Sequence, residues 1–226
     1  MTIRVLIADD QDSVRFGFRT ILRAAEDIEV VAEAADGETA LALTQRLRPD
    51  VVIADIRMPG MDGLELTRRL CAADAPITAR VVVATAYDLD AYVHTALRHG
   101  ASGFLVKHSG PALLTEAVRA AVAGDALISP TVTVRLLRKL ASTTTEPTRK
   151  PEPALSDRET EIVSLVADGL TNPEIGDRLY ITTGTVKTHL TSIQRKLKVR
   201  NRVGIAHWAW ETRTHTRTPG VPGEQR

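Results

Sequence analysis

Short apolar runs alternate with longer amphipathic stretches along the first half of the chain. The short runs are continuous and rich in Val, Ile and Ala, which is typical of strands buried on both faces of a parallel sheet. They predict strands at residues 4–8, 30–34, 51–54, 80–84 and 103–106. Apolar residues at helical spacing then predict helices at residues 14–25, 38–47, 63–73, 90–99 and 111–123.

Five successive strand-and-helix units predict an α/β fold with a doubly wound, five-stranded parallel sheet. Right-handed crossovers place helices on both faces of such a sheet, so its strands are buried on both sides. Ligands of open parallel sheets bind at the carboxyl ends of the strands. The residues that end or follow each strand are therefore the candidates for a functional site.

The pattern changes after Gly124. Residues 132–140 predict one short helix, and residues 141–153 lack apolar periodicity and contain three prolines, which indicates a linker. Helical spacing returns at residue 155, and the end of the chain has the composition of a disordered tail. We therefore expect an α/β domain at 1–127, a linker helix and linker at 128–154, a small all-α domain at 155–211 and a tail at 212–226.

The composition, with 43% apolar and 25% charged residues, is that of a globular protein and excludes wholesale disorder. A single cysteine excludes an intramolecular disulfide framework, and no apolar run has the length of a signal peptide or membrane span. These features predict a soluble, cytoplasmic protein with no membrane partner.

The net charge of +1 conceals a division between the two halves of the chain. Residues 1–130 carry 13 basic and 18 acidic side chains, a net charge of −5, whereas residues 131–154 and 155–226 each carry +3. An acidic front half joined to a basic back half favours nucleic acid as the partner of the back half.

Carboxylate, hydroxyl and ammonium side chains stand at the ends of four expected strands: Asp9 and Asp10, Asp55, Thr85, and Lys107. Three carboxylates at one edge repel each other unless a cation lies among them, and oxygen ligands favour Mg²⁺. A carboxylate beside Mg²⁺ can attack phosphorus and form an aspartyl phosphate, with an ammonium stabilising the transferring group. A lone aspartate after a strand is more often a helix N-cap, but this whole set favours a phosphoacceptor site.

The string Asp55-Ile-Arg-Met-Pro-Gly-Met-Asp-Gly63, with Asp9-Asp10 before it and Gly103-Phe-Leu-Val-Lys107 after it, resembles the receiver domain of bacterial two-component response regulators. The resemblance covers residues 3–130 and implies a CheY-like, flavodoxin-like fold. It also implies that a sensor histidine kinase phosphorylates Asp55. Pro59 and Gly60 form a turn signal in their own right, beside that residue.

Further site residues follow from the same resemblance. It implies that Thr85 and Lys107 contact the phosphoryl oxygens, and that Phe104 is a switch residue that changes rotamer when Thr85 moves. It implies that Mg²⁺ is held by the side chains of Asp9, Asp10 and Asp55 and by the backbone carbonyl of Arg57.

Three helices are expected in the back half. Ser156 and Glu159 form the pattern of a capping box, and a second helix starts with Asn172 as its N-cap. A third helix is expected over residues 183–197, with a basic, polar face made of Lys187, Thr188, Thr191, Gln194, Arg195 and Lys196. A short helix, a tight turn and a polar second helix favour a helix-turn-helix that enters the major groove. From spacing alone, a three-helix protein-interaction module is an equal alternative.

The strings at residues 185–190 and 196–202 resemble the LuxR-type helix-turn-helix of NarL/FixJ-family response regulators. The resemblance implies that base edges are faced by Lys187, Thr188 and Thr191, and that residues near phosphates are Thr171, Asn172, Thr185, His189 and Arg195. It also implies that the helix after Arg202 serves in dimerisation.

The sequence therefore predicts a transcription regulator controlled by phosphorylation of Asp55. Its expected partners are a sensor histidine kinase, double-stranded DNA and a second copy of the chain when active, with RNA polymerase as a further candidate. We expect no enzymatic turnover beyond slow self-dephosphorylation. One alternative is a Mg²⁺-dependent phosphatase, which usually needs a second acid where this chain has Arg57. The other is a phosphorylation-independent DNA-binding regulator with a vestigial receiver.

Overall fold

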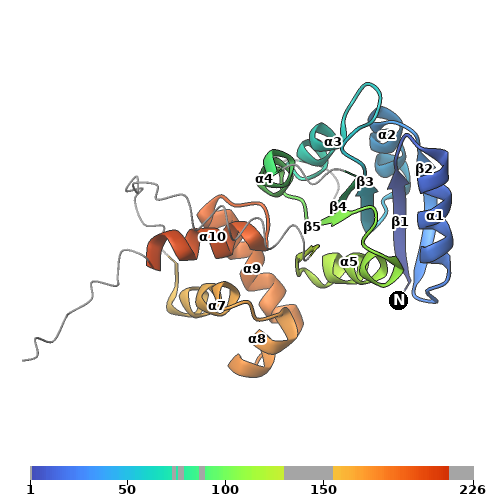
Figure 1. Cartoon of the computed structure of the whole chain (residues 1–226). Helices are drawn as coiled ribbons and strands as arrows, with labels where there is room; N and C mark the ends of the chain where they lie inside the picture. Colours follow the sequence, from blue (N-terminus) through green and yellow to red (C-terminus); the bar gives the residue numbers. More distant parts are fainter. Residues whose placement is uncertain (1, 73–74, 76–78, 87–89, 130–154, 214–226) are drawn as a thin grey trace, which may run out of the picture. The chain divides into compact units, whose positions relative to one another are not determined.

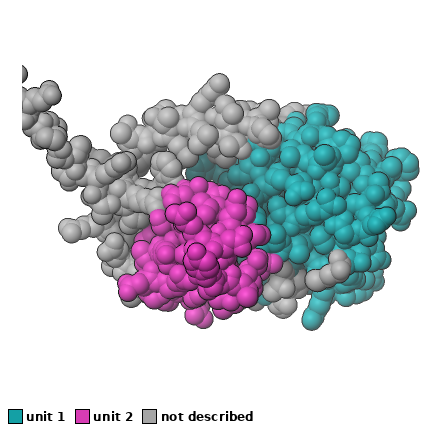
Figure 2. Space-filling view, turned by 90° about the horizontal axis from the view of Figure 1, so that it is seen from below, with its two compact units in different colours: residues 1–145, 199–202 teal, residues 146–198, 203–226 magenta. Residues whose placement is uncertain are grey.

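The structure, a computed structural model, describes residues 2–72, 75, 79–86, 90–129 and 155–213. It divides into two compact units, residues 1–145 with 199–202 and residues 146–198 with 203–226 (Figure 2). The expected helix at 132–140, the linker at 141–153 and residues 214–226 of the expected tail lie outside the described residues. None of the helices described is both long enough and apolar enough to cross a bilayer.

The first unit is built on a parallel sheet with the strand order β2-β1-β3-β4-β5-β6 (Figure 1). Its strands are β1 (Ile3–Ala8), β2 (Ile28–Ala34), β3 (Val51–Ala54), β4 (Arg80–Thr85), β5 (Gly103–Val106) and β6 (Leu127–Ile128). The sequence predicts five of these six strands. It misses β6 because two residues show no periodicity, and this strand is defined by its pairing with Gly103 and Phe104 of β5.

Helices cover both faces of the sheet, which confirms the doubly wound fold. α1 (Asp12–Arg23) and α5 (Pro111–Ala123) lie on one face, and α2 (Gly37–Leu47), α3 (Gly63–Leu70) and α4 (Asp90–His99) lie on the other (Figure 1). Alternate strand residues serve two cores: in β1, Val5 and Ile7 pack towards α1 and α5, whereas Leu6 packs towards α2, α3 and α4. Burial on both sides explains why the strands are continuous apolar runs.

The second unit is all α, as expected, with helices α7 (Asp157–Ala167), α8 (Asn172–Leu179), α9 (Thr183–Leu197) and α10 (Arg202–Arg213). All four contribute fully buried side chains to one core, including Ile162, Ile175, Ile193 and Ile205. α10 includes residues 212 and 213, which the sequence assigns to the tail. A change of composition locates a helix end only to within a residue or two.

The N-caps of α7 and α8 show how these short helices begin. At α7 the Glu159 carboxylate accepts from the Ser156 N–H at 2.8 Å and the Ser156 hydroxyl accepts from the Glu159 N–H at 3.3 Å, which confirms the expected capping box. At α8 the N-cap is Thr171 rather than the predicted Asn172. Glu174 lies three residues after Thr171 and accepts from its N–H at 2.7 Å. This capping box makes Thr171 the N-cap, one residue before the predicted one.

Glu159 also joins α7 to α9. Its carboxylate is only 4% exposed and accepts hydrogen bonds from the Ser192 hydroxyl at 2.8 Å and from Lys196 Nζ at 2.6 Å. The hydrogen bond from Lys196, followed by the one from the Ser156 N–H, lowers the pKa of Glu159 to about 2. The charged form of this buried carboxylate is therefore stabilised by hydrogen-bond donors from the start of α7 and from α9.

We expect Glu159→Gln to destabilise the second unit and to reduce its sensitivity to acid. Because the folded pKa lies below the ordinary value of 4.5, ionised Glu159 adds stability above that pH, and this contribution is lost as the pH falls from 4.5 towards 2. Weakening hydrogen bonds to a charged group costs about 1–3 kcal/mol near neutral pH. Trp208 and Trp210, the only tryptophans in the sequence, lie in α10, so urea unfolding of the full chain followed by tryptophan fluorescence reports on this unit.

The matched control for this substitution is Glu161→Gln on the same helix. Glu161 lies on the surface, where it pairs with Arg158 at 2.8 Å, so its replacement should change stability little. Equal losses of stability in the two variants would contradict the role given to Glu159.

Candidate functional site

The register of the parallel sheet brings the expected site residues to one edge. The last residues of β1 and β3 pair with each other, so Asp9 and Asp55 follow side by side. The last residues of β4 and β5 also pair, which places Lys107 beside Thr85. The Lys107 N–H donates to the Thr85 carbonyl at 2.9 Å and extends this pairing by one residue.

Asp9, Asp55 and Lys107 form a buried ionic cluster at this edge. Asp9 is 1% exposed and Asp55 is 4% exposed. Lys107 Nζ lies 2.6 Å from Asp9 Oδ2 and 2.9 Å from Asp55 Oδ2. Burial raises the pKa of Asp9 although Lys107 opposes the shift, whereas for Lys107 the two carboxylates outweigh burial and raise its pKa. The lysine is therefore held in its charged form between two carboxylates.

The same edge offers oxygen ligands for a divalent cation. One carboxylate oxygen from each of Asp9, Asp10 and Asp55 lies within 4.8 Å of the others, and Asp10 is exposed. Asp9 Oδ2 is buried, and its partner among the described residues is Lys107 Nζ, which also pairs with Asp55. Two buried carboxylates thus share one ammonium, and an all-oxygen donor set suits Mg²⁺. The residues present therefore fit the expected metal.

Thr85 and Phe104 lie on neighbouring strands of the sheet. Both are buried, at 1% and 0% exposure. Thr85 is the last residue of β4 and lies at the same edge of the sheet as Asp55 and Lys107. Phe104 lies before the end of β5, in the core that faces α2, α3 and α4. The rotamer change expected of Phe104 stays a prediction.

The loop between β3 and α3 folds tightly around Asp55. Gly60 has a φ of 65°, in keeping with the turn signal that it forms with Pro59. The Gly63 N–H donates to the Ile56 carbonyl at 2.9 Å and closes the loop. A Cβ at Gly63 would lie 1.9 Å from the Asp55 carbonyl oxygen, so this approach requires glycine.

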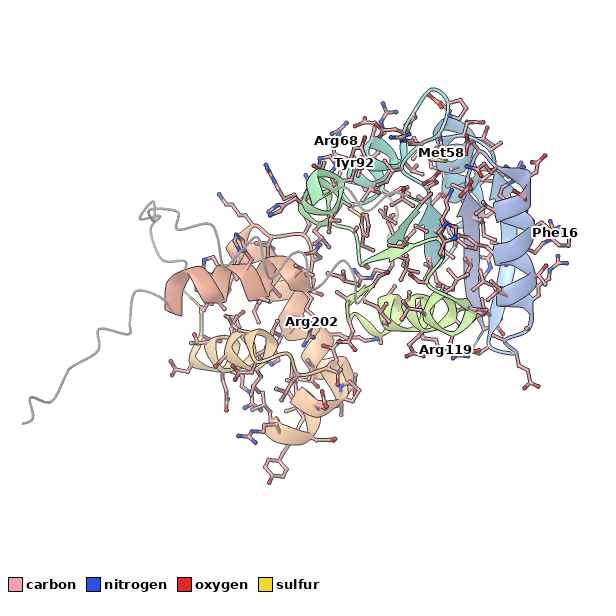
Figure 3. All side chains as sticks on the ribbon, viewed as in Figure 1. Phe16, Met58, Arg68, Tyr92, Arg119 and Arg202 are labelled. Carbon is pink, nitrogen blue, oxygen red and sulfur yellow. The ribbon has the colours of Figure 1, made fainter. Side chains whose placement is uncertain are left out.

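Two contacts near the site and one exposed aromatic residue of α1 have no signal in the sequence. Arg15 Nη1 donates to the Asp9 carbonyl at 2.6 Å, and Glu38 Oε2 accepts from the Met61 N–H at 3.0 Å. Phe16 is 61% exposed and points outward from α1 (Figure 3). Each depends on how elements pack in three dimensions, and helical spacing alone does not indicate it.

α8 and α9 form the expected helix-turn-helix, and α9 presents a polar face. Val186, Leu190 and Ile193 are buried on its other side. The Thr188 and Thr191 hydroxyls donate to backbone carbonyls one turn earlier, which leaves their oxygens able to accept. The structure places most of the candidate DNA-binding residues at the surface: His189 is half-buried, and the exposed ones are Thr171, Thr185, Lys187, Thr188, Thr191 and Arg195.

One candidate DNA-binding residue, Asn172, is placed differently from expectation. Asn172, expected near a phosphate, is 0% exposed at the start of α8, so its side chain does not reach the surface. Because Thr171 is the N-cap, Asn172 is the first residue of the helix, and its side chain is buried within the unit. Lys196 is exposed, as expected of the polar face of α9, and its Nζ donates to the buried Glu159 carboxylate at 2.6 Å.

Comparison with known proteins matches both units to families. A family described as response regulator receiver domain matches residues 5–119, and one described as bacterial regulatory proteins, luxR family, matches residues 153–209. The transcriptional regulatory protein LiaR of Bacillus subtilis (strain 168) is 39% identical over 207 residues, which cover 92% of this chain and 96% of LiaR. The nitrate/nitrite response regulator protein NarL of Escherichia coli (strain K12) is 36% identical over 209 residues, which cover 92% of this chain and 95% of NarL.

Solved structures give the same result. The response regulator ChrA of a haem-sensing two-component system is 39% identical, with a TM-score of 0.52, over 94% of this chain and 98% of ChrA. A complex of the two-component response regulator RcsB with DNA is 27% identical, with a TM-score of 0.56, over 93% of this chain and 99% of the RcsB chain.

We expect Asp9→Asn to have opposite effects without and with Mg²⁺. Without Mg²⁺ the substitution removes one of two buried carboxylates that repel each other, so the melting temperature of the first unit should rise. With Mg²⁺ it removes a ligand, so most of the Mg²⁺-induced rise in melting temperature should disappear. Far-UV circular dichroism melts of the full chain measure both effects.

Asp62→Asn is the control for this pair of melts. Asp62 is exposed and caps α3 by accepting from the Glu65 N–H at 2.7 Å, a role that asparagine also fills. This variant should keep the wild-type response to Mg²⁺. A wild-type melting temperature that does not respond to Mg²⁺, or an Asp9→Asn response equal to it, would contradict the assigned metal site.

Proposed function

We propose, from the premise that the chain belongs to the NarL/FixJ family of two-component response regulators, that phosphorylation of Asp55 controls DNA binding by its LuxR-type domain. The family itself regulates transcription. The observation that carries the proposal is the buried cluster at the sheet edge, where Lys107 Nζ lies within 3 Å of both Asp9 and Asp55. Removing these charges from water disfavours folding, so the cluster is poorly explained by a structural role, but it is suited to stabilising a transferring phosphoryl group.

Each residue of the cluster has a proposed role in phosphoryl transfer. Asp55 Oδ attacks the phosphorus of a phosphohistidine on a sensor kinase, the P–N bond breaks, and the histidine ring, already protonated on its other nitrogen, leaves as the neutral imidazole. Lys107 and Thr85 donate to the phosphoryl oxygens. The side chains of Asp9, Asp10 and Asp55 and the carbonyl of Arg57 would hold Mg²⁺, which would neutralise charge on the phosphoryl group when bound. Slow hydrolysis of the acyl phosphate resets the receiver.

The proposed output is sequence-specific DNA binding by a dimer. Lys187, Thr188 and Thr191 on the exposed face of α9 are assigned to base edges. Thr171, Thr185, His189 and Arg195 are assigned to phosphates, and the buried Asn172 is removed from that set. The RcsB–DNA complex lends support, because RcsB is a response regulator bound to DNA with a related fold. A homodimer places two such helices on paired half-sites.

The intact cluster argues against a vestigial receiver, because loss of phosphorylation would leave a buried ionic site without a function to maintain it. A phosphatase is disfavoured by Arg57, which occupies the place of its second acid. The domain bounds 1–127, 128–154, 155–211 and 212–226 and a cytoplasmic setting are part of the proposal.

We expect acetyl phosphate with Mg²⁺ to add one phosphoryl group to the wild-type chain and none to Asp55→Asn. Removing the attacking oxygen abolishes the acyl phosphate without changing the volume of the side chain. Intact-mass spectrometry measures the product, with Asp62→Asn as a control that removes a carboxylate from the same loop and should be labelled like the wild type. Equal labelling of Asp55→Asn and wild type would overturn the assignment of Asp55.

We expect Lys187→Ala to weaken binding to the preferred DNA sequence more than binding to random DNA. A contact with a base edge contributes about 1–3 kcal/mol of discrimination, whereas a contact with phosphate weakens binding to all sequences alike. The preferred sequence comes from in-vitro selection with the phosphorylated protein, and fluorescence anisotropy measures the two affinities. Arg23→Ala, on the exposed end of α1, is the charge-matched control. A uniform loss for Lys187→Ala would place this lysine on phosphate.

A further inference from the structure

Glu38 lies outside the ionic cluster, in the first turn of α2, and its carboxylate reaches the loop that follows Asp55. Glu38 Oε2 accepts a hydrogen bond from the Met61 N–H at 3.0 Å. Met61 and Glu38 are 23 residues apart in the sequence, so this bond ties two segments that only the fold brings together. The loop it holds is the one that carries both Asp55 and the carbonyl of Arg57.

The backbone around this contact is built for a close approach. Gly60 has a φ of 65°, and a Cβ there would lie 2.8 and 2.9 Å from the two Glu38 carboxylate oxygens. A Cβ at Gly37 would lie 2.2 Å from the Met61 carbonyl oxygen. Glycine is therefore favoured at residue 37 by the close backbone approach and at residue 60 by its positive φ.

The backbone that carries Glu38, whose side chain is exposed, is ordered by a helix cap. The Asp36 carboxylate caps α2 by accepting from the Thr39 N–H at 2.7 Å and from its hydroxyl at 2.8 Å, which orders the first turn. A hydrogen bond from the Gly63 N–H to the Ile56 carbonyl joins the two ends of the loop. The segment from Asp55 to Gly63 is thus held at two points, one within the loop and one from α2.

We propose that Glu38 is a positioning residue for phosphoryl transfer. By holding the Met61 N–H, it keeps the loop in the conformation in which the Asp55 carboxylate and the Arg57 carbonyl lie at the metal and phosphoryl site. This inference rests on the proposed phosphorylation of Asp55. A carboxylate in the first turn of a helix also stabilises that helix through its dipole, and the experiment must separate the two roles.

The test compares Glu38→Ala with Glu38→Gln in the full chain. Alanine removes the acceptor, whereas glutamine keeps an oxygen that can accept from the Met61 N–H, and both remove the charge at the helix end. The rate of labelling by acetyl phosphate is measured as a function of Mg²⁺ concentration by mass spectrometry. We expect Glu38→Ala to need about threefold to tenfold more Mg²⁺ for half-maximal rate, as the loss of one hydrogen bond implies, and Glu38→Gln to stay close to wild type.

Glu65→Ala is the matched control, since Glu65 follows the same loop but pairs with Arg68 and Arg69 of its own helix. It should leave the Mg²⁺ dependence unchanged. If Glu38→Ala does not fold, Gly60→Ala takes its place, because its Cβ displaces the Glu38 carboxylate, and it should raise the Mg²⁺ requirement likewise.

Three outcomes would overturn the role of Glu38. Glu38→Ala could have the Mg²⁺ requirement of the wild type, or Glu38→Gln and Glu38→Ala could raise that requirement equally. Glu38→Ala could also lower the melting temperature without changing the Mg²⁺ requirement. Failure of the proposed function is a separate result, because then the wild-type chain itself is not labelled at Asp55.

Discussion

The arrangement of two carboxylates and one ammonium at the end of a parallel sheet is the constraint on which the first unit depends. Asp9 and Asp55 are almost fully buried and share Lys107, whose Nζ lies 2.6 and 2.9 Å from them. Burying such a group disfavours folding unless partners compensate, and here two carboxylates share a single ammonium. The site therefore carries an excess of buried negative charge and is suited to receive a cation and a phosphoryl group.

The rest of the first unit serves to hold that cluster. The sheet fixes Asp9, Asp55, Thr85 and Lys107 by register, since each ends or follows a strand paired with the next. The loop after Asp55 is held by glycines and by one hydrogen bond to α2, so the proposed metal ligand on it, the Arg57 carbonyl, is positioned by packing rather than by a rigid element. In the second unit, Glu159 performs a comparable task by joining the start of α7 to the end of α9.

Much of this is predictable from the sequence, for physical reasons. Strands buried on both faces give continuous apolar runs, and parallel strands gather their ends at one edge, so Asp9, Asp55, Thr85 and Lys107 could be assigned together. Contacts between distant segments have no such signal. The bond from Met61 to Glu38 and the pairing of Lys196 with Glu159 depend on tertiary packing, and Asn172 is buried where the N-cap is Thr171, one residue earlier than predicted.

The central claim is that the state of Asp55 sets the affinity of the second unit for DNA. The most direct measurement is the affinity of the full chain for its selected DNA sequence, before and after treatment with acetyl phosphate and Mg²⁺, for wild type and for Asp55→Asn. The account predicts that treatment changes the affinity of the wild type and leaves that of Asp55→Asn unchanged. The same affinity for the wild type in both states, with Asp55 shown to be phosphorylated, would contradict it.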